Sequence, residues 1–333
     1  MAFIIFLMLL ITRSSSEKMR GHIPNEAFNY SFRPDFIPKD AYLIDLHSHT
    51  IASDGFMTPE QNILWHKANG FNAFALTDHN TGANNGTLLA LQEKYPDMVL
   101  IPGYEWTITR VHLNFLGITD FSGNVPNLSK DDEDVKFAIA KAKELGAIVQ
   151  VDHITWTEDQ PHLRTGEFLH PTRDQLLDWG VDGFEIYNEM RWADPNTIYW
   201  LENLRATGEL PRTVYLSTGT DIHSPLKEWA TCWTELLLTH EEREQPSWEI
   251  IKQALLEGRT RIWSDQDYRR PPEMKYQAGN DYSKKKRILA PFYGLKDMFG
   301  NAPGGISGIA WDIVCLVLLY FPLRFLFLWL FSF

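Results

Sequence analysis

Short apolar runs that alternate with helix-like segments constrain the fold of this chain more than any other feature. Stretches such as TPEQNILWHKAN and NTIYWLENLRATG have the character of helices, and several such stretches have a Thr, Asp or Asn start and a Gly stop. Because repeated strand–helix units form a parallel sheet, we expect one α/β domain over residues 40–265, closed by a further strand and a helix. The predicted strands are AYLIDLHSH, FNAFALTDH, MVLIPGYEW, VHLNFLGI, AIVQVDHI, GFEIYN and TVYLSTGTDIH, followed by the strand WATCWTELLL and the helix SWEIIKQALLEG.

Histidines and carboxylates stand at the ends of these runs. His47 and His49 are two residues apart, so on a strand both imidazoles lie on one face and can reach one point in space. Other runs end in D-H, E-W, D-H-I and D-I-H, which places metal-ligand side chains where the active sites of α/β barrels are assembled. The run VHLNFLGI is the exception, because His112 stands at its start. The pattern predicts a metal centre at one end of the domain.

Composition narrows the class of protein. A chain of 333 residues with 44% hydrophobic content can hold one barrel-sized domain or two ordinary ones. The formal net charge of -12 argues against a broad basic surface for nucleic acid, so we expect no stable nucleic-acid partner, although a small phosphate ester held by metal remains compatible. Cys232 and Cys315 are the only cysteines, which excludes a disulfide framework and a zinc–cysteine site.

Both ends of the chain are apolar. Residues 1–20 contain the run AFIIFLMLLI but no basic n-region, so we expect either a signal peptide or a short N-terminal anchor. Residues 266–304 are predicted to form a linker or arm, and residues 309–333 a transmembrane segment, whose apolar part of about 21 residues could cross a membrane of about 30 Å. A buried or interfacial helix and a lipid-anchor signal are the alternatives. We expect a membrane-associated protein with an exported catalytic domain; a tail anchor facing the cytoplasm is the other orientation.

The motifs DLHSHT with SDG, TDHN, GYE, VHLNFLG, VDH and GTDIH occur in this order and together resemble those of the polymerase and histidinol phosphatase (PHP) superfamily. The resemblance covers roughly residues 42–265 and implies a distorted (βα)7 TIM-like barrel with two to three divalent ions (Mn, Fe or Zn). It implies the following ligands: His47, His49 and Asp221 for the first ion, His112 and His153 for the second with Glu105 bridging the two, and Asp54, His79 and His223 for the third.

Two positions depart from the family pattern. Asp54 stands where many members have His, which favours Mn or Fe(II) over Zn at the third ion. Ile154 follows His153 where a proline is common. Amidohydrolases also begin with H-x-H but often bridge their metals through a carbamylated lysine; no predicted strand end offers a lysine here, and Glu105 takes that role. We therefore favour phosphate ester chemistry over amide chemistry.

The resemblance implies hydrolysis of a small phosphomonoester or phosphodiester by a hydroxide bridging two ions, as in the exported phosphodiesterases of the superfamily. Glu105, Asp221 and Arg191 are the predicted catalytic residues. Arg191, like Arg164 and Lys227, is a candidate to neutralise substrate phosphate. A 3′–5′ exonuclease or nuclease, and a catalytically silent, membrane-tethered metal-binding module, are the alternative functions.

Residues outside the ligand set receive weaker predictions. Asp45, Asp78 and Asp152 precede ligand histidines and either orient their rings or cap strand ends. The tryptophans after strand ends either line a substrate cleft or pack over the barrel rim; these are Trp106, Trp156, Trp192 and Trp229. The remaining histidines, which no motif supports, are expected at the surface or on helices; these are His22, His66, His162, His170 and His240.

Overall fold

The computed structural model describes residues 20–265, except residues 109, 124–130, 156–169, 190–191 and 226–227. These residues belong to one compact unit that spans Arg20–Tyr276. The predicted leader, linker and tail therefore lie outside the described residues, and so do Trp156, His162, Arg164, Arg191 and Lys227. Within the described part of the chain, no helix has the length and apolar character needed to cross a membrane.

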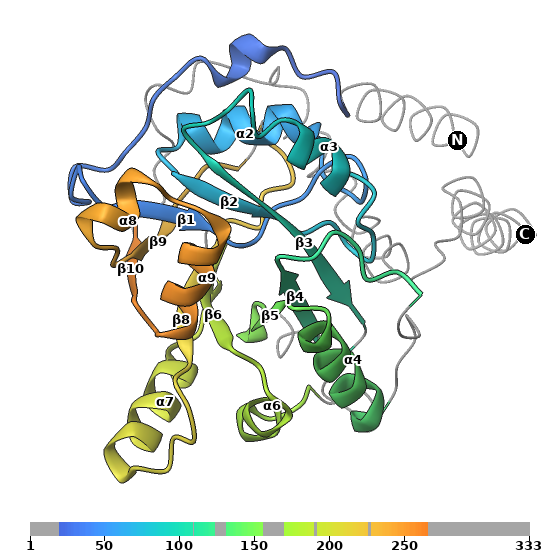
Figure 1. Cartoon of the computed structure of the whole chain (residues 1–333), viewed down its shortest axis with the longest axis vertical. Coiled ribbons are helices and arrows are strands. Elements are labelled where there is room, and N and C mark those ends of the chain that lie inside the picture. The colour runs from blue at the N-terminus through green and yellow to red at the C-terminus, as the bar shows by residue number, and fades with distance from the viewer. Residues whose placement is uncertain are drawn as a thin grey trace, which may run out of the picture. The chain divides into compact units, whose positions relative to one another are not determined.

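A single curved sheet forms the centre of the described unit (Figure 1). The neighbouring strands are hydrogen-bonded in the order β10-β9-β1-β2-β3-β4-β5-β6-β7, and β8 pairs with β6. All seven predicted strands are present, together with the additional strand β9, whereas β7 and β10 were not predicted. The bounds are β1 (Tyr42–Asp45), β2 (Ala73–Leu76), β3 (Val99–Thr107), β4 (His112–Leu116), β5 (Ile148–Val151), β6 (Gly183–Asn188), β7 (Trp192–Ala193), β8 (Tyr215–Gly219), β9 (Cys232–Leu236) and β10 (Thr260–Ser264).

The sheet is mixed: the predicted parallel pairing is present between some neighbouring strands, whereas other neighbours are antiparallel. Strands β1, β2 and β3 run parallel, and so do β5, β6 and β8, but β4 is antiparallel to both β3 and β5. Only residues 108–111 connect β3 to β4. That connection is far shorter than the crossover of about a dozen residues that a parallel pair needs, so the two strands form a hairpin.

The curled sheet is not closed by a backbone ladder among the described strands. β8 lies beside β9, where the Thr218 amide donates to Thr234 Oγ1 over 2.8 Å and Cys232 Sγ contacts the Gly219 carbonyl oxygen at 3.5 Å. Side-chain contacts thus take the place of ladder hydrogen bonds at this seam. The result is a half-barrel of mixed strands, consistent with the distorted TIM-like architecture that the motifs implied.

Helices cover the outside of the sheet where the periodicity predicted them (Figure 1). Thr58 and Thr172 each begin a helix with a capping box, in which the threonine hydroxyl accepts from a backbone amide and a glutamine side chain caps in return. The 3-10 helix η1 and the short α8 were not predicted. The bounds are η1 (Asn25–Phe28), α2 (Pro59–Ala68), α3 (Asn85–Ala90), α4 (Asp132–Glu144), α6 (Arg173–Trp179), α7 (Pro195–Thr207), α8 (His240–Glu244) and α9 (Trp248–Leu256).

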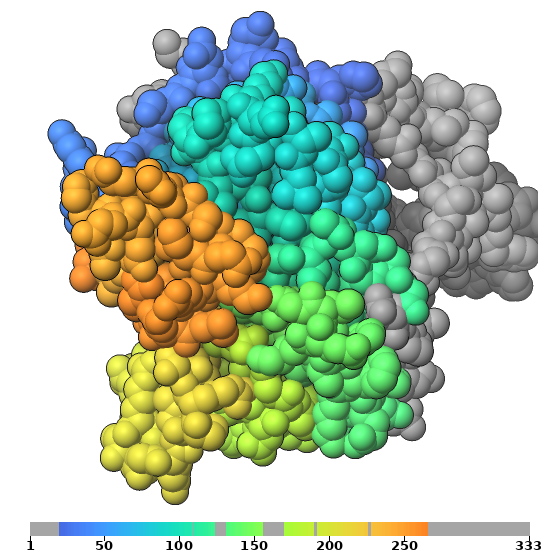
Figure 2. Space-filling view, viewed as in Figure 1, coloured from blue at the N-terminus to red at the C-terminus, as the bar shows by residue number. Residues whose placement is uncertain are grey.

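Helix α9 packs against the amino-terminal end of the parallel strands. Its buried residues Ile251 and Leu255 share one hydrophobic cluster with Ala73 and Val99, at the starts of β2 and β3, and with Leu116, at the end of the antiparallel β4. Figure 2 shows the α8–α9 region in orange, packed between the N-terminal part of the unit and the yellow region of α7. Because apolar side chains fill this end, a polar site is left to the opposite end of the strands.

Candidate metal centre

All nine predicted metal ligands lie at the carboxyl-terminal edge of the parallel strands. His112 meets the others there because β4 runs antiparallel, so the first residue of β4 lies at the edge where β3 ends. This strand direction explains the exception in the sequence pattern. The ligands are placed as follows: His47 and His49 after β1, Asp54 in the loop that follows, His79 after β2, Glu105 within β3, His112 at the start of β4, His153 after β5, and Asp221 and His223 after β8.

Glu105 lies at the centre of the cluster and is fully buried. Its two carboxylate oxygens face different histidines, so this one side chain can bridge two ions. Oε1 lies 2.7 Å from His112 Nδ1 and 3.8 Å from His153 Nε2, whereas Oε2 lies 2.8 Å from His79 Nδ1 and 3.3 Å from both His47 Nε2 and His49 Nε2.

Asp221 flanks the other side of the first histidine pair. Its Oδ1 atom lies 2.8 Å from His49 Nε2 and 3.4 Å from His47 Nε2. The backbone of Asp221 has φ of 48°, and that of His153 has φ of 25°. Both are left-handed conformations that non-glycine residues seldom adopt, and such strain is concentrated at functional sites.

Asp54 forms the solvent-facing edge of the centre. Its Oδ1 atom lies 3.2 Å from His223 Nε2 and 3.6 Å from His79 Nε2, and its side chain is 43% exposed. The loop that carries Asp54 is fastened by Asp78, whose Oδ1 atom accepts from the Thr50 amide at 2.7 Å and from Ser53 Oγ at 2.6 Å. Through these two bonds Asp78 holds the loop that carries Asp54. Neither bond involves a histidine ring.

The crowding of charged groups shifts several pKa values in the metal-free protein. Burial lowers the pKa of His112 to about 4, although Glu105 opposes the shift. Burial also acts to lower the pKa of His79, but the carboxylates of Glu105 and Asp54 outweigh it and raise this pKa to about 9. Burial likewise acts to raise the pKa of Glu105, yet the surrounding histidines hold it well below the ordinary value. The carboxylates are thus ready to bind a cation as anions.

The residues present fit divalent metal ions. His49 Nδ1 and Nε2, Asp54 Oδ1 and Asp221 Oδ1 are buried polar atoms that lack a hydrogen bond of acceptable geometry among the described residues. Leaving such atoms unpaired is costly, and a cation bound to them would remove the penalty. Imidazole and carboxylate ligands suit Mn, Fe and Zn. Ligand atoms lie within 4.8 Å of one another in four groups of these residues: His49, Asp54, His79 and His223; His47, Glu105 and His153; His47, His49 and Asp221; and His79, Glu105 and His112.

A fifth group of this kind contains Glu185, which sequence reasoning missed. Glu185 is buried within β6, and its Oε1 atom lies 3.1 Å from His47 Nδ1. Asp152, which was predicted either to orient a ring or to cap a strand, lies 3.9 Å from the same nitrogen. The available signal was a carboxylate in the middle of the strand-like run GFEIYN, where a buried charge needs a polar partner.

Other predictions for individual side chains had mixed outcomes. His66 is fully buried on α2, stacked on Phe74 with ring centroids 4.0 Å apart, so its expected surface position was wrong, although it does lie on a helix. Its Nε2 atom lies 2.9 Å from Asp45 Oδ2, so Asp45 contacts this histidine ring instead of a predicted ligand ring.

Trp106 is buried against Phe115 and belongs to the core, whereas His22 and His240 are exposed, as expected. His170 is half-buried.

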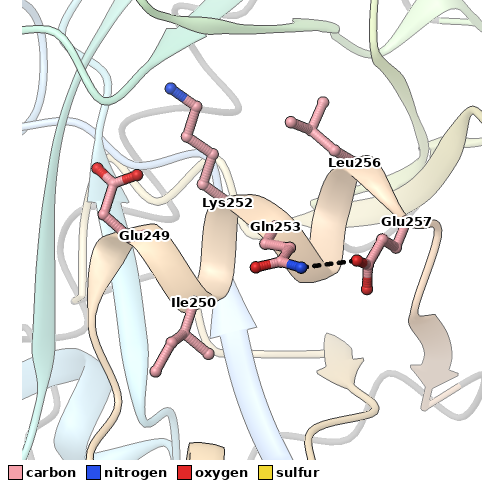
Figure 3. Close-up of a pocket in the computed structure, with 6 residues that line it drawn as sticks. All are labelled: Glu249, Ile250, Lys252, Gln253, Leu256 and Glu257. Atoms are coloured by element: carbon pink, nitrogen blue, oxygen red, sulfur yellow. Dashed lines mark hydrogen bonds between the residues drawn. The ribbon is translucent and has the colours of Figure 1, made fainter.

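A cavity of about 440 Å³ lies elsewhere, on the outer side of α9 (Figure 3). Figure 3 shows that its lining side chains come from α9 and from Glu257, the residue that follows this helix; Gln253 Nε2 donates to Glu257 Oε1 over 2.8 Å. None of them belongs to the candidate metal centre. Because α9 packs at the amino-terminal end of the strands, this cavity is separate from the nine ligands.

No family model matches the sequence, and no curated protein matches it either. The structure is similar to that of a two-domain protein from Bacteroides vulgatus ATCC 8482, described as containing a predicted PHP-like metal-dependent phosphoesterase. The TM-score is 0.53 at 23% sequence identity, and the match covers 71% of this chain and 68% of that chain. This likeness supports the predicted barrel-like α/β fold for the described part of the chain.

Two other solved structures are less similar to this chain. One is to a protein from Bifidobacterium adolescentis ATCC 15703, assigned by prediction as a metal-dependent phosphoesterase, with TM-score 0.42, 15% identity and coverage of 65% of this chain and 96% of that one. The other is to an amidohydrolase from Chromobacterium violaceum with bound sulfate and no metal, with TM-score 0.42, 17% identity and coverage of 66% and 97%.

Proposed function

We propose that this chain, which has the fold of a PHP-like phosphoesterase domain, hydrolyses phosphate esters with the help of two or three divalent ions, Mn, Fe or Zn. The observation that carries the proposal is the position of Glu105. Its two carboxylate oxygens reach the rings of histidines from the ends of β1, β2 and β5 and from the start of β4. A buried carboxylate surrounded by histidines from four strands suits a bridge between metal ions.

Each ion would have its own ligands. His47, His49 and Asp221 would hold the first, His112 and His153 the second, and Glu105 would join the two. Asp54, His79 and His223 would hold the third at the solvent-facing edge. When bound, the ions supply Lewis acidity, which lowers the pKa of coordinated water to near neutrality and offsets the charge of a phosphate group.

The side chains themselves would keep the centre rigid and accessible. His223 Nδ1 lies 2.7 Å from the carbonyl oxygen of Asp221, a hydrogen bond that leaves Nε2 facing Asp54. His79 Nδ1 lies 2.6 Å from Thr107 Oγ1, which orients the opposite ring nitrogen toward the same carboxylate. The side chains of His79 and His223 are each 23% exposed, so this edge is where a substrate phosphate would enter.

The formal charge of the metal centre supports a phosphorylated substrate, although the chain as a whole is acidic. Six neutral histidines and three carboxylates contribute a formal charge of about -3, and three divalent ions would add about +6. The loaded centre would therefore attract an anionic ester, with no need for a basic surface around it. Phosphomonoesters and phosphodiesters are both anionic, so either would be attracted in this way. Arg191 stays a predicted phosphate-binding residue outside the described part of the chain.

The proposal is tested with the full chain, loaded separately with Mn, Fe(II) or Zn, by measuring metal content and the hydrolysis of p-nitrophenyl phosphate and bis(p-nitrophenyl) phosphate. We expect two to three ions per chain and cleavage of at least one ester. A chelator should abolish hydrolysis, and metal addition should restore it. Protein that binds no metal, or that binds it and cleaves neither ester nor a wider set of phosphate esters, would overturn the proposal. Release of nucleotides from single-stranded DNA would point to the nuclease alternative.

A further inference from the structure

We propose that Glu185 is a positioning residue that holds three of the candidate ligands, His47, His153 and Asp221, in their metal-binding geometry. The inference rests on the proposed function. Glu185 is itself 1% exposed and lies on β6, a strand that supplies none of the nine ligands. It would act by fixing the residues that touch the ions.

The first contact orients the His47 ring. Glu185 Oε1 lies 3.1 Å from His47 Nδ1, while Nε2 on the other side of the ring lies 3.3 Å from Glu105 Oε2. Because a carboxylate oxygen accepts and does not donate, this contact would keep the His47 proton on Nδ1 and leave the Nε2 lone pair for the first ion when that ion is bound. Such a contact fixes the tautomer and raises the basicity of the ligand nitrogen.

The second contact reaches the other two ligands. Glu185 Oε2 accepts from the backbone amide of His153 at 2.9 Å and from Asn188 Nδ2 at 3.0 Å. The bond to His153 supports a backbone with φ of 25°, which is unfavourable for a residue with a side chain. Asn188 Nδ2 also lies 3.4 Å from Asp221 Oδ2, so the network continues to the end of β8.

The local backbone is built around this carboxylate. The ladder between β6 and β8 shifts register between Glu185 and Tyr187, as in a β-bulge. Residues three apart face opposite sides of a regular strand, but this irregularity lets Asn188 reach Glu185. On β8, a Cβ atom at Gly219 would lie 1.7 Å from Glu185 Oε1 and 2.7 Å from His47 Cβ. The absence of a side chain at Gly219 thus leaves the space that the Glu185–His47 pair occupies.

Asp152 is the competing candidate for the same role. Its Oδ1 atom lies 3.9 Å from His47 Nδ1, beyond hydrogen-bond length, and accepts instead from Gln150 Nε2 at 2.9 Å. The shorter contact and the second bond to His153 favour Glu185. Two separate variants, Glu185→Gln and Asp152→Asn, show which of these carboxylates orients the His47 ring.

The test loads the full chain with Co(II) and follows binding by visible absorption, which reports the ligands of each ion. We expect Glu185→Gln to lower the affinity for the first ion about 10- to 100-fold and to change the spectrum, since second-sphere partners of ligand histidines contribute on that scale. At saturating metal, kcat should fall while KM stays nearly constant. Asp152→Asn should have a smaller effect.

Glu235→Gln is the matched control, because Glu235 is a buried carboxylate on β9 that accepts from Trp263 Nε1 at 2.9 Å. It should leave Co(II) binding unchanged. Glu185→Asp keeps the charge but shortens the side chain, so it supplies a second variant in case the amide does not fold; we expect an intermediate loss of affinity. Wild-type affinity and spectrum in the folded Glu185 variants would overturn the inference alone, whereas failure of the wild-type chain to bind Co(II) would overturn the proposed function with it.

Discussion

Glu105 Oε1 lies 2.7 Å from His112 Nδ1, although the two residues belong to strands that run in opposite directions. In the β3–β4 ladder, Thr107 is the direct partner of His112, and Glu105 is paired with Asn114. Glu105 and His112 are therefore diagonal neighbours on one face of an antiparallel pair, close enough for their side chains to meet. The hairpin thus adds a ligand to a site that the parallel strands build at their ends.

Replacement of Glu105 tests the bridge. Glu105→Gln keeps the volume of the side chain but removes its charge, so the chain should lose at least one ion. Hydrolysis should fall more than about 100-fold, because even second-sphere substitutions cost 10- to 100-fold. Metal analysis and ester hydrolysis measure the two effects, with Glu235→Gln as the control. Unchanged metal content in the Glu105 variant would show that this carboxylate does not bridge the first and second ions.

Removal of Asp54 should affect the third ion alone. Asp54 lies at the exposed edge, and its ion-pair contacts among the candidate ligands are with His79 and His223. We therefore expect Asp54→Asn to release one ion and retain the others, with reduced hydrolysis. Counting ions per chain after dialysis distinguishes this result from a collapse of the whole centre. Loss of every ion would contradict the assignment of separate sites.

Metal binding should release protons. In the metal-free protein burial acts to lower the pKa of His79, but Glu105 and Asp54 raise it to about 9, so this ring is protonated at neutral pH. A metal ligand must be neutral imidazole, and the proton competes with the ion below that pKa. Apparent affinity should therefore rise with pH between 7 and 9. Calorimetry in buffers of different ionisation enthalpy measures the released protons, and an affinity independent of pH between 7 and 9 would contradict the prediction.

Helix α9 should contribute to stability and not to metal binding. Leu255 is fully buried against the amino-terminal end of the strands, whereas the next residue, Leu256, is 44% exposed. Leu255→Ala should lower the free energy of unfolding by about 2–5 kcal/mol, as large-to-small core substitutions do. Leu256→Ala is the matched control on the same helix and should cost less than about 0.5 kcal/mol. Urea denaturation measures both, and metal content should match the wild type in each folded variant.

The nine side chains that lie together were assigned through the resemblance to the PHP superfamily, whose motifs are short local stretches of sequence. The positions of histidines and carboxylates at strand ends, taken alone, predicted only a metal centre at one end of the domain. The motifs did not predict the position of His66, which lies buried on α2 beside Asp45. The helix had been recognised, but which of its polar residues face inward depends on how α2 packs on the sheet. Glu185 was missed for a similar reason, since its partners come from β1 and β5.

The sequence by itself determined most of the strands, most of the helices and the chemical character of the site, because apolar periodicity, capping residues and H-x-H spacing act within a few residues. Only the tertiary structure decided the antiparallel course of β4, the irregularity in the β6–β8 ladder and the space at Gly219 that admits Glu185 beside His47. These features depend on contacts between residues far apart in the chain, whose free energies are set by packing and by the pairing of buried charges.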